Sequence, residues 1–192
     1  MTALILNLNP VIDLTDEQFF QLCVNNRDLR LERTAEGEII IMPPTGWESG
    51  NRNARLTQRV GNWADADGTG LAFDSSTGFI LPNRASRSPD AAWVRRERIE
   101  ALNPNPDRFL PLAPDFVVEL RSASDSLATV QNKMREYIAN GVCLGWLIDP
   151  QNQRVEIYRQ GRDVEIVESP SSLSGEDVLP GLVLDLERIL NK

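Results

Sequence analysis

Histidine is missing from this chain of 192 residues, and lysine occurs only twice among its 20 basic residues. The absence of an imidazole excludes Ser-His-Asp and Cys-His catalysis, histidine-dependent metal nucleases and zinc hydrolases. The sequence also lacks the G-x-x-x-x-G-K-[ST] motif, which excludes a P-loop that cradles nucleotide phosphates. Hydrolytic chemistry here would therefore need carboxylates, lysine, arginine, hydroxyl groups or a metal ion held by oxygen ligands.

Cysteine is also scarce, and no apolar run approaches the ~18 residues that a transmembrane helix needs. Cys23 and Cys143 stand far apart and outside any C-x-x-C pair, which argues against a zinc site or a disulfide framework. The opening "MTALILNLNP" has neither the basic region nor the small-residue cleavage site of a secretory signal. We therefore expect a cytoplasmic protein without a membrane-spanning segment.

The chain is acidic, with a formal net charge of −8, although its 41% apolar and 25% charged residues are ordinary for a globular protein. Its length suits one domain and no repeat divides it, so we expect a single domain over residues 1–192. Because an acidic surface repels nucleic acid, a function on nucleic acid requires locally concentrated arginine. One arginine group surrounds Asp90, either as a solvated surface or as a contact for phosphates: Arg84, Arg87, Arg95, Arg96 and Arg98.

Hydrophobic periodicity predicts three main helices, over about 13–26, 46–64 and 124–140. Alternating or apolar segments predict a hairpin and further strands, over about 29–42, 71–75, 78–82, 90–96, 116–120, 142–150, 154–161 and 163–169. This order predicts an α/β (α+β) fold in which helices flank a mixed central sheet. The core is expected to contain Trp47, Trp93 and Trp146.

A single acid, Glu119, interrupts the apolar run in the stretch "PDFVVELRS". An ionised carboxylate in a buried strand is destabilising unless a cation or strong donors meet it. A second Pro-Asp pair, in "SPDAAWV", places Asp90 at the start of the preceding predicted strand. The helix after Glu119 carries Lys133, the only lysine besides the C-terminal Lys192.

We predict that Asp90 and Glu119, on neighbouring strands, together bind a hard divalent cation such as Mg²⁺, which prefers oxygen ligands. The ion would polarise a phosphodiester and lower the pKa of a bound water. Lys133 would orient or deprotonate that water, or stabilise charge that develops on the phosphate. Glu48, from its helix, and the backbone carbonyl of Leu120 are further candidate ligands.

Each of these residues also has an interpretation without catalysis. Glu119 could be a buried structural acid paired with Arg121, and Asp90 could simply begin a strand, since aspartate favours turns. Glu48 could complement the dipole at the start of its helix. Lys133 could be an ordinary solvated helix lysine, and Arg121 a charge partner.

The motifs together resemble a known group of nucleases. A strand-borne Pro-Asp, followed about thirty residues later by an acid-x-basic strand, resembles the PD-(D/E)XK nuclease superfamily. More narrowly, "SPDAAWV … PDFVVELRSASDSL … KMREYIANGVCLGWLIDP" resembles the Uma-type restriction endonuclease family, which is abundant in cyanobacteria. The resemblance runs from about Thr15 to Leu186 and implies a restriction-endonuclease-like core.

The resemblance also implies roles for single residues: Asp90 and Glu119 as metal ligands, and Glu48 as a helix acid. The third superfamily position, normally lysine, is Arg121 here. Arginine stays protonated, so it could stabilise charge but could not act as a base. In the Uma-type pattern the lysine lies on the following helix, where this chain has Lys133.

Two functions are therefore open. The first is an endonuclease that depends on Mg²⁺ (or Mn²⁺), hydrolyses DNA with Asp90, Glu119, Lys133 and Arg121, and holds its metal with Asp90, Glu119 and Glu48. The second is a catalytically inactive relative that keeps the fold for nucleic-acid binding or assembly. The set Asp90–Glu119–Lys133 favours the first, whereas Arg121 and the net charge favour the second. A homodimer suits the first, because cutting both strands of a duplex needs two sites.

Overall fold

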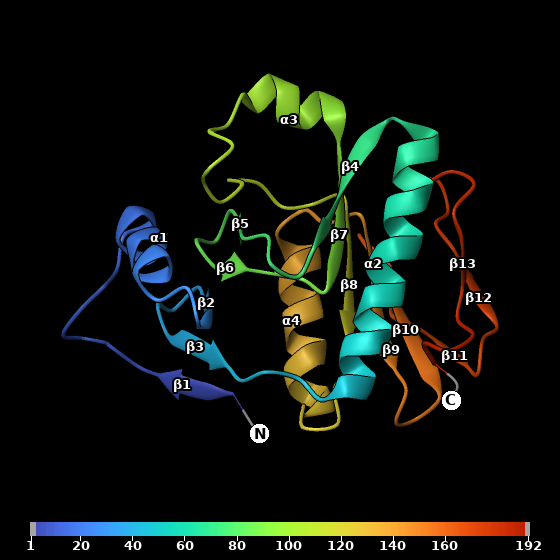
Figure 1. The fold of residues 1–192 in the computed structure, drawn as a ribbon, viewed down its shortest axis with the longest axis horizontal. Helices are drawn as coiled ribbons and strands as arrows, with labels where there is room; N and C mark the ends of the chain where they lie inside the picture. Colours follow the sequence, from blue (N-terminus) through green and yellow to red (C-terminus); the bar gives the residue numbers. More distant parts are fainter. Residues whose placement is uncertain (1–2, 191–192) are drawn as a thin grey trace.

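A six-stranded mixed sheet forms the centre of the molecule in the computed structural model, which describes residues 3–190 (Figure 1). Its strands follow the order β11-β10-β9-β8-β7-β4. Their bounds are β4 Gly70–Asp74, β7 Ala91–Arg95, β8 Phe116–Leu120, β9 Leu144–Asp149, β10 Arg154–Arg159 and β11 Glu165–Glu168. β8 and β9 run parallel, whereas the other neighbours are antiparallel. The predicted mixed central sheet is confirmed.

Helices cover both faces of this sheet (Figure 1). Side chains alternate across each strand, so Trp93 and Val118 pack in one apolar cluster with α2 (Trp47–Asp67). Val94 and Val117 pack in a second cluster with α4 (Leu127–Ala139) on the opposite face. The remaining helices are α1 (Asp16–Asn25) and the short α3 (Arg96–Leu102). The flanking helices are therefore confirmed as well.

A second, five-stranded sheet lies beside α4 (Figure 1). It has the order β1-β3-β2-β6-β5. Its strands are β1 Leu4–Leu6, β2 Arg30–Arg33, β3 Ile39–Met42, β5 Phe79–Ile80 and β6 Ser86–Arg87. β2 and β3 form the predicted hairpin, and the single pair Arg33↔Ser86 joins it to β6. Nothing in the sequence pattern indicated that this hairpin belongs to a separate sheet. Near the C-terminus, β12 (Ser172–Ser174) pairs with β13 (Val183–Asp185).

One tryptophan differs from the prediction. Trp93 and Trp146 are buried, as expected, but Trp47 is 86% exposed. Trp47 is the first residue of α2, and the residues of that helix that enter the core begin at Leu56. The presence of a tryptophan at the start of α2 therefore did not indicate whether that residue would be buried.

No helix within residues 3–190 combines the length and the apolar character needed to cross a bilayer.

Two glycines provide a matched test of this packing. A Cβ on Gly70 in β4 would lie 2.4 Å from the Trp93 ring and from the Val94 carbonyl oxygen, whereas a Cβ on Gly61 in α2 would meet nothing within 4 Å. We expect Gly70→Ala to lower the free energy of unfolding by about 1–3 kcal/mol through overpacking. Gly61→Ala should raise it by about 0.5–1 kcal/mol, because alanine favours a helix interior. Urea denaturation measures both, and equal effects would contradict the packing of β4 on β7.

Candidate active site

Asp90 and Glu119 lie together at one end of the central sheet. β7 and β8 pair antiparallel with Ala91 opposite Val118, so one further step of this register places Asp90 opposite Glu119. Residues opposite each other in an antiparallel pair direct their side chains to the same face. Asp90 Oδ2 also accepts a hydrogen bond of 2.8 Å from the backbone N–H of Leu120, the residue after Glu119. The sheet thus brings together the two acids that the sequence singled out.

Lys133 on α4 reaches this pair. Its Nζ lies 2.9 Å from Glu119 Oε1 and donates to Glu32 Oε1 at 2.8 Å. One helical turn further on, the Tyr137 hydroxyl also donates to Glu119 Oε1, at 2.9 Å. An ammonium group and a phenol therefore meet the acid that interrupts the apolar strand. Lys133 is not a solvated surface residue, because its side chain is 16% exposed.

The third acid, Glu32, was missed by sequence reasoning. It lies on β2, is 2% exposed, and accepts a hydrogen bond of 3.0 Å from the backbone N–H of Ser88 as well as the one from Lys133. Arg87 on β6 donates to Glu32 Oε2 at 3.1 Å and to Glu136 Oε2 at 2.6 Å. Glu32 and Lys133 are 101 residues apart in sequence, and no local pattern could have indicated their contact.

Arg87 belongs to the arginine group that the sequence offered as a phosphate contact. It is instead 8% exposed and held between Glu32 and Glu136. Other members pair with acids of the chain as well: Arg98 lies 2.9 Å and Arg95 3.9 Å from Asp115. Much of the positive charge of this group is thus neutralised within the protein.

The cluster of buried and half-buried charged groups has an excess of negative charge. Its four carboxylates outnumber its two cations, and the exposed Arg30 also acts on Asp90, so at least one negative charge stays uncompensated when every group is ionised. The carboxylates are Glu32, Asp90, Glu119 and Glu136, and the cations are Lys133 and Arg87. Uncompensated charges in a poorly solvated place are strongly unfavourable. The cluster can relieve this excess by taking up protons or by binding a divalent cation.

The pKa values reflect the same imbalance. Burial raises the pKa of Asp90, although the Leu120 N–H and the Lys133 charge oppose this rise. Burial also raises the pKa of Glu119 to about 7, because the charge of Lys133 does not offset it and Asp90 and Glu32 add to it. Burial would raise the pKa of Glu32 too, but there the charges of Lys133 and Arg87 outweigh it and lower the pKa.

Lys133 is an ammonium ion in this environment. Burial alone would lower its pKa, but the charges of Glu119 and Glu32 outweigh burial and raise the pKa above the usual value for lysine. Burial and the neighbouring Glu119 likewise raise the pKa of Tyr137, which keeps its proton and remains a donor. A lysine held in this way can stabilise negative charge but is a poor general base.

The donor set suits a hard cation bound by few protein ligands. Both Asp90 oxygens accept one hydrogen bond each and retain a lone pair, and no donor within residues 3–190 reaches Glu119 Oε2. In this part of the chain no group of three or more acids, cysteines or histidines is arranged to hold a metal. Mg²⁺ commonly takes one or two carboxylates and keeps several waters. Asp90 and Glu119 fit that requirement.

Glu48 does not join the pair. It lies in the first turn of α2 and forms an ion pair of 3.0 Å with Arg52, one turn along the same helix. Asn53 is the α2 residue that faces the site, since its Nδ2 donates to Asp90 Oδ1 at 2.7 Å. Five residues correspond to about 140° around a helix, so Glu48 and Asn53 point in different directions. The set of three ligands Asp90, Glu119 and Glu48 is not assembled in this structure.

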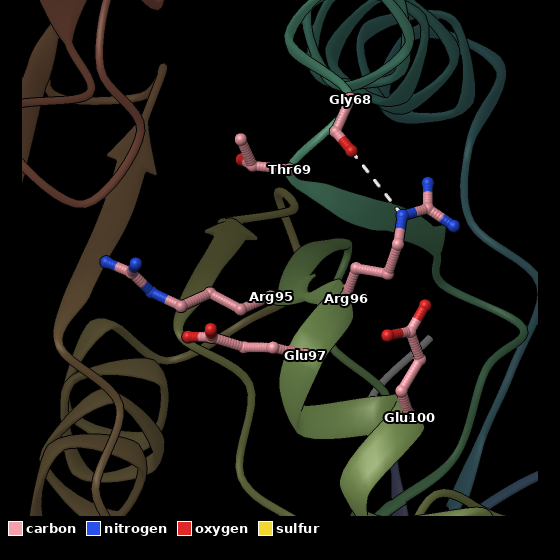
Figure 2. A pocket seen from close by; sticks show the side chains of 6 residues that line it. All are labelled: Gly68, Thr69, Arg95, Arg96, Glu97 and Glu100. Atoms are coloured by element: carbon pink, nitrogen blue, oxygen red, sulfur yellow. Dashed lines mark hydrogen bonds between the residues drawn. The ribbon is translucent and has the colours of Figure 1, made fainter.

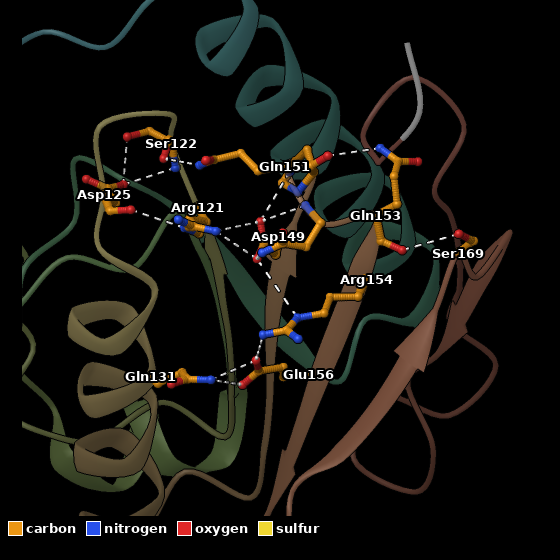
Figure 3. Close-up of polar contacts among 12 residues, drawn as sticks. Arg121, Ser122, Asp125, Gln131, Asp149, Gln151, Gln153, Arg154, Glu156 and Ser169 are labelled. Atoms are coloured by element: carbon orange, nitrogen blue, oxygen red, sulfur yellow. Dashed lines mark hydrogen bonds and ion pairs between the residues drawn. The ribbon is translucent and has the colours of Figure 1, made fainter.

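Arg121 contacts neither of the two acids within residues 3–190 and points toward Asp149 (Figure 3). Its Nη1 donates to Asp149 Oδ2 at 3.0 Å, and its Nε donates to the Asp125 carbonyl oxygen at 3.1 Å. Asp149, at the end of β9, is fully buried and therefore needs a cationic partner. Arg121, which the sequence pattern offered for catalysis, is thus paired with Asp149 of β9. This agrees with the interpretation of Arg121 as a charge partner.

A hollow of about 360 Å³ lies elsewhere (Figure 2). It is lined by residues of the α2–β4 turn and of α3, together with the last residue of β7: Gly68, Thr69, Arg95, Arg96, Glu97 and Glu100. Asp90 precedes the first residue of β7, so the hollow and the acidic pair mark opposite ends of that strand. The four carboxylates and two cations of the acidic cluster do not line this hollow.

The placement of Arg121 generates a test. We expect Arg121→Met to lower the free energy of unfolding by about 1–3 kcal/mol, because it removes a charged partner from the buried Asp149. The affinity for Mg²⁺, measured by calorimetry, should stay that of the unchanged protein, since no contact links Arg121 to Asp90 or Glu119 within residues 3–190. A loss of Mg²⁺ affinity with unchanged stability would restore Arg121 to the site.

Comparison with known proteins agrees with the geometry. The model of the Uma2 family, described as "Putative restriction endonuclease", matches residues 16–187. A solved structure, described as a "putative nuclease belonging to DUF820" from Anabaena variabilis ATCC 29413, is 21% identical and has a TM-score of 0.76. The match covers 92% of this chain and 97% of that one, and it shows a shared fold. No curated protein matches the chain. The chain belongs to the Uma2 family of restriction-endonuclease-like proteins, as its motifs predicted.

Proposed function

We propose that the protein is an Mg²⁺-dependent endonuclease that hydrolyses phosphodiester bonds of DNA at the Asp90–Glu119–Lys133 site. The observation that carries this proposal is the pair of carboxylates Asp90 and Glu119 at the end of β7 and β8, in a cluster where carboxylates outnumber cations. A divalent cation would supply the missing positive charge. Membership of a family described as "Putative restriction endonuclease" supports a nucleic-acid substrate.

In this mechanism Asp90 and Glu119 would hold the ion. When bound, Mg²⁺ would polarise the phosphodiester and lower the pKa of a water. Asn53 Nδ2 and the Leu120 N–H orient the Asp90 carboxylate, while the Tyr137 hydroxyl orients Glu119. These donors keep the two carboxylates in place before substrate arrives, which reduces the reorganisation that binding requires.

Lys133 serves as a fixed positive charge. Because its pKa is raised by two carboxylates, it stabilises the negative charge that develops on the phosphate rather than removing a proton from water. In the reaction the water oxygen forms a bond to phosphorus, and the bond from phosphorus to the leaving sugar oxygen breaks. A proton from the water ends on the leaving oxygen, which gives a phosphomonoester and a free hydroxyl.

A non-catalytic function in nucleic-acid binding or assembly is the second candidate. The net charge of −8 favours it, as does the pairing of Arg121 with Asp149, which takes the basic residue of the acid-x-basic strand away from the acids.

A homodimer that brings two sites to a duplex belongs to the first proposal. Sedimentation of the protein with and without DNA measures its oligomeric state.

Metal binding separates the two candidates. A ligand that binds only the folded protein stabilises it by about 2.7 kcal/mol at a hundred times its dissociation constant, so Mg²⁺ or Mn²⁺ should raise the melting temperature. Asp90→Asn and Glu119→Gln should abolish this rise. Glu48→Gln is the matched control and should retain it, because Glu48 pairs with Arg52 instead of the site acids. Absence of any metal-dependent rise in the unchanged protein would remove the support for a metal-dependent nuclease.

The role of Lys133 is tested by the cleavage rate. We expect the protein to nick supercoiled plasmid in Mn²⁺, and Lys133→Met to lower that rate by about 10²–10³-fold, the range seen when a donor to a developing charge is removed. Metal affinity should persist in this variant, since Lys133 is a neighbour of the ligands rather than a ligand. Nicking that survives Asp90→Asn would indicate a contaminant or another site.

A further inference from the structure

Asn53 on α2 has an unpaired oxygen beside the acidic pair. Its Nδ2 donates to Asp90 Oδ1 at 2.7 Å, but its Oδ1 is buried and accepts no hydrogen bond within residues 3–190. Four other side-chain atoms in this part of the chain are buried without a partner; they belong to Ser86, Trp93, Trp146 and Arg154. Among these five atoms, only Asn53 Oδ1 belongs to a side chain that forms a hydrogen bond with Asp90 or Glu119.

The orientation of the Asn53 amide follows from its partner. An ionised carboxylate only accepts hydrogen bonds, so the NH₂ group must face Asp90 and the carbonyl oxygen must point elsewhere. Rotating the amide by half a turn would set two oxygens against each other. A buried acceptor that lacks a donor is destabilising, and such an exception in a folded protein calls for a missing partner.

We infer that Asn53 is a further positioning residue of the proposed metal site: its Nδ2 fixes Asp90, and its Oδ1 would accept a hydrogen bond from a water of the bound divalent cation. This inference rests on the proposed function. Mg²⁺ retains several waters when few carboxylates bind it, and each such water is a strong donor. A hydrated ion would thus supply the partner that Asn53 Oδ1 lacks. Asn53 lies on α2, the helix that was expected to contribute Glu48.

A purely structural role has a different consequence. If Asn53 served only as the donor to Asp90, aspartate at this position would fail, because a carboxylate cannot donate. Asn53→Asp and Asn53→Leu both lose the donor to Asp90, but if Asn53 Oδ1 serves the hydrated cation, Asn53→Asp keeps an acceptor and adds a negative charge that the cation attracts. The two roles therefore predict different Mg²⁺ affinities for Asn53→Asp relative to Asn53→Leu.

The experiment measures Mg²⁺ and Mn²⁺ affinity of the full chain by calorimetry, without any substrate. We expect Asn53→Leu, which has similar volume and no polar atoms, to weaken binding by about 10–100-fold, as do other changes to groups that support metal ligands. Asn53→Asp should bind more tightly than Asn53→Leu, and the metal-induced rise in its melting temperature should be larger than that of Asn53→Leu. Asn51→Leu and Asn51→Asp, at an exposed position of the same helix, control for helix propensity and for added charge.

The outcomes distinguish this inference from the proposed function. If Asp90→Asn binds the metals as well as the unchanged protein, the proposed site itself is wrong. If Asp90→Asn abolishes binding while Asn53→Leu binds normally, or if Asn53→Asp loses affinity as Asn53→Leu does, the role of Asn53 as an acceptor is wrong and the metal site stands. An equal gain in Asn51→Asp and Asn53→Asp would reduce the effect to overall charge and would also overturn the inference.

Discussion

The ammonium group of Lys133, held between Glu119 and Glu32, is the interaction on which the site depends. It joins three elements that are distant in sequence: the strand β8, the helix α4 and the strand β2 of the second sheet. Leaving a buried charge without its partner typically costs 3–5 kcal/mol. The second sheet thus contacts the rest of the molecule at the candidate active site. The geometry of the site therefore depends on the packing of the second sheet.

This cluster is not arranged for stability. Burial raises the pKa values of Asp90 and Glu119, which means that their ionised forms are disfavoured in the folded protein. A protein keeps such a cost when function requires it, and sites of this kind commonly trade stability for activity. A cation at the proposed site would reverse the balance, because the same carboxylates would then face opposite charge. The same excess of negative charge therefore disfavours the ionised acids and favours a cation at the proposed metal site.

The distribution of arginine has a related consequence. Many arginines of this acidic chain pair with carboxylates of the chain itself, such as Arg87 with Glu32 and Arg121 with Asp149. They hold buried acids in place and leave less positive surface for phosphates. A polyanionic substrate would therefore meet little exposed positive charge unless a cation occupies the proposed site, and such attraction weakens as salt screens it. Binding of DNA without a metal ion should be weak on this account.

The sequence by itself predicted the mixed sheet, the flanking helices and the family, and it selected Asp90, Glu119 and Lys133 as candidates. The sheet and helices follow from local periodicity, the family from a resemblance of motifs, and the choice of Glu119 from an acid in an apolar strand, all of which are properties of short segments. It also indicated that Glu119 needs a cation or donor, since burial of a lone carboxylate is unfavourable in any fold.

Only the tertiary structure decided which groups surround those residues. Glu32 enters the site through a second sheet, Asn53 replaces Glu48 as the contribution of α2, and Asp149 takes Arg121 away from the acids. The contacts of Glu32 and Asp149 join segments that are far apart in the chain. The choice of Asn53 over Glu48 depends on the direction of each side chain around the helix axis. Short-range patterns cannot predict such contacts, because the position of one element against another is set by the packing of the whole core.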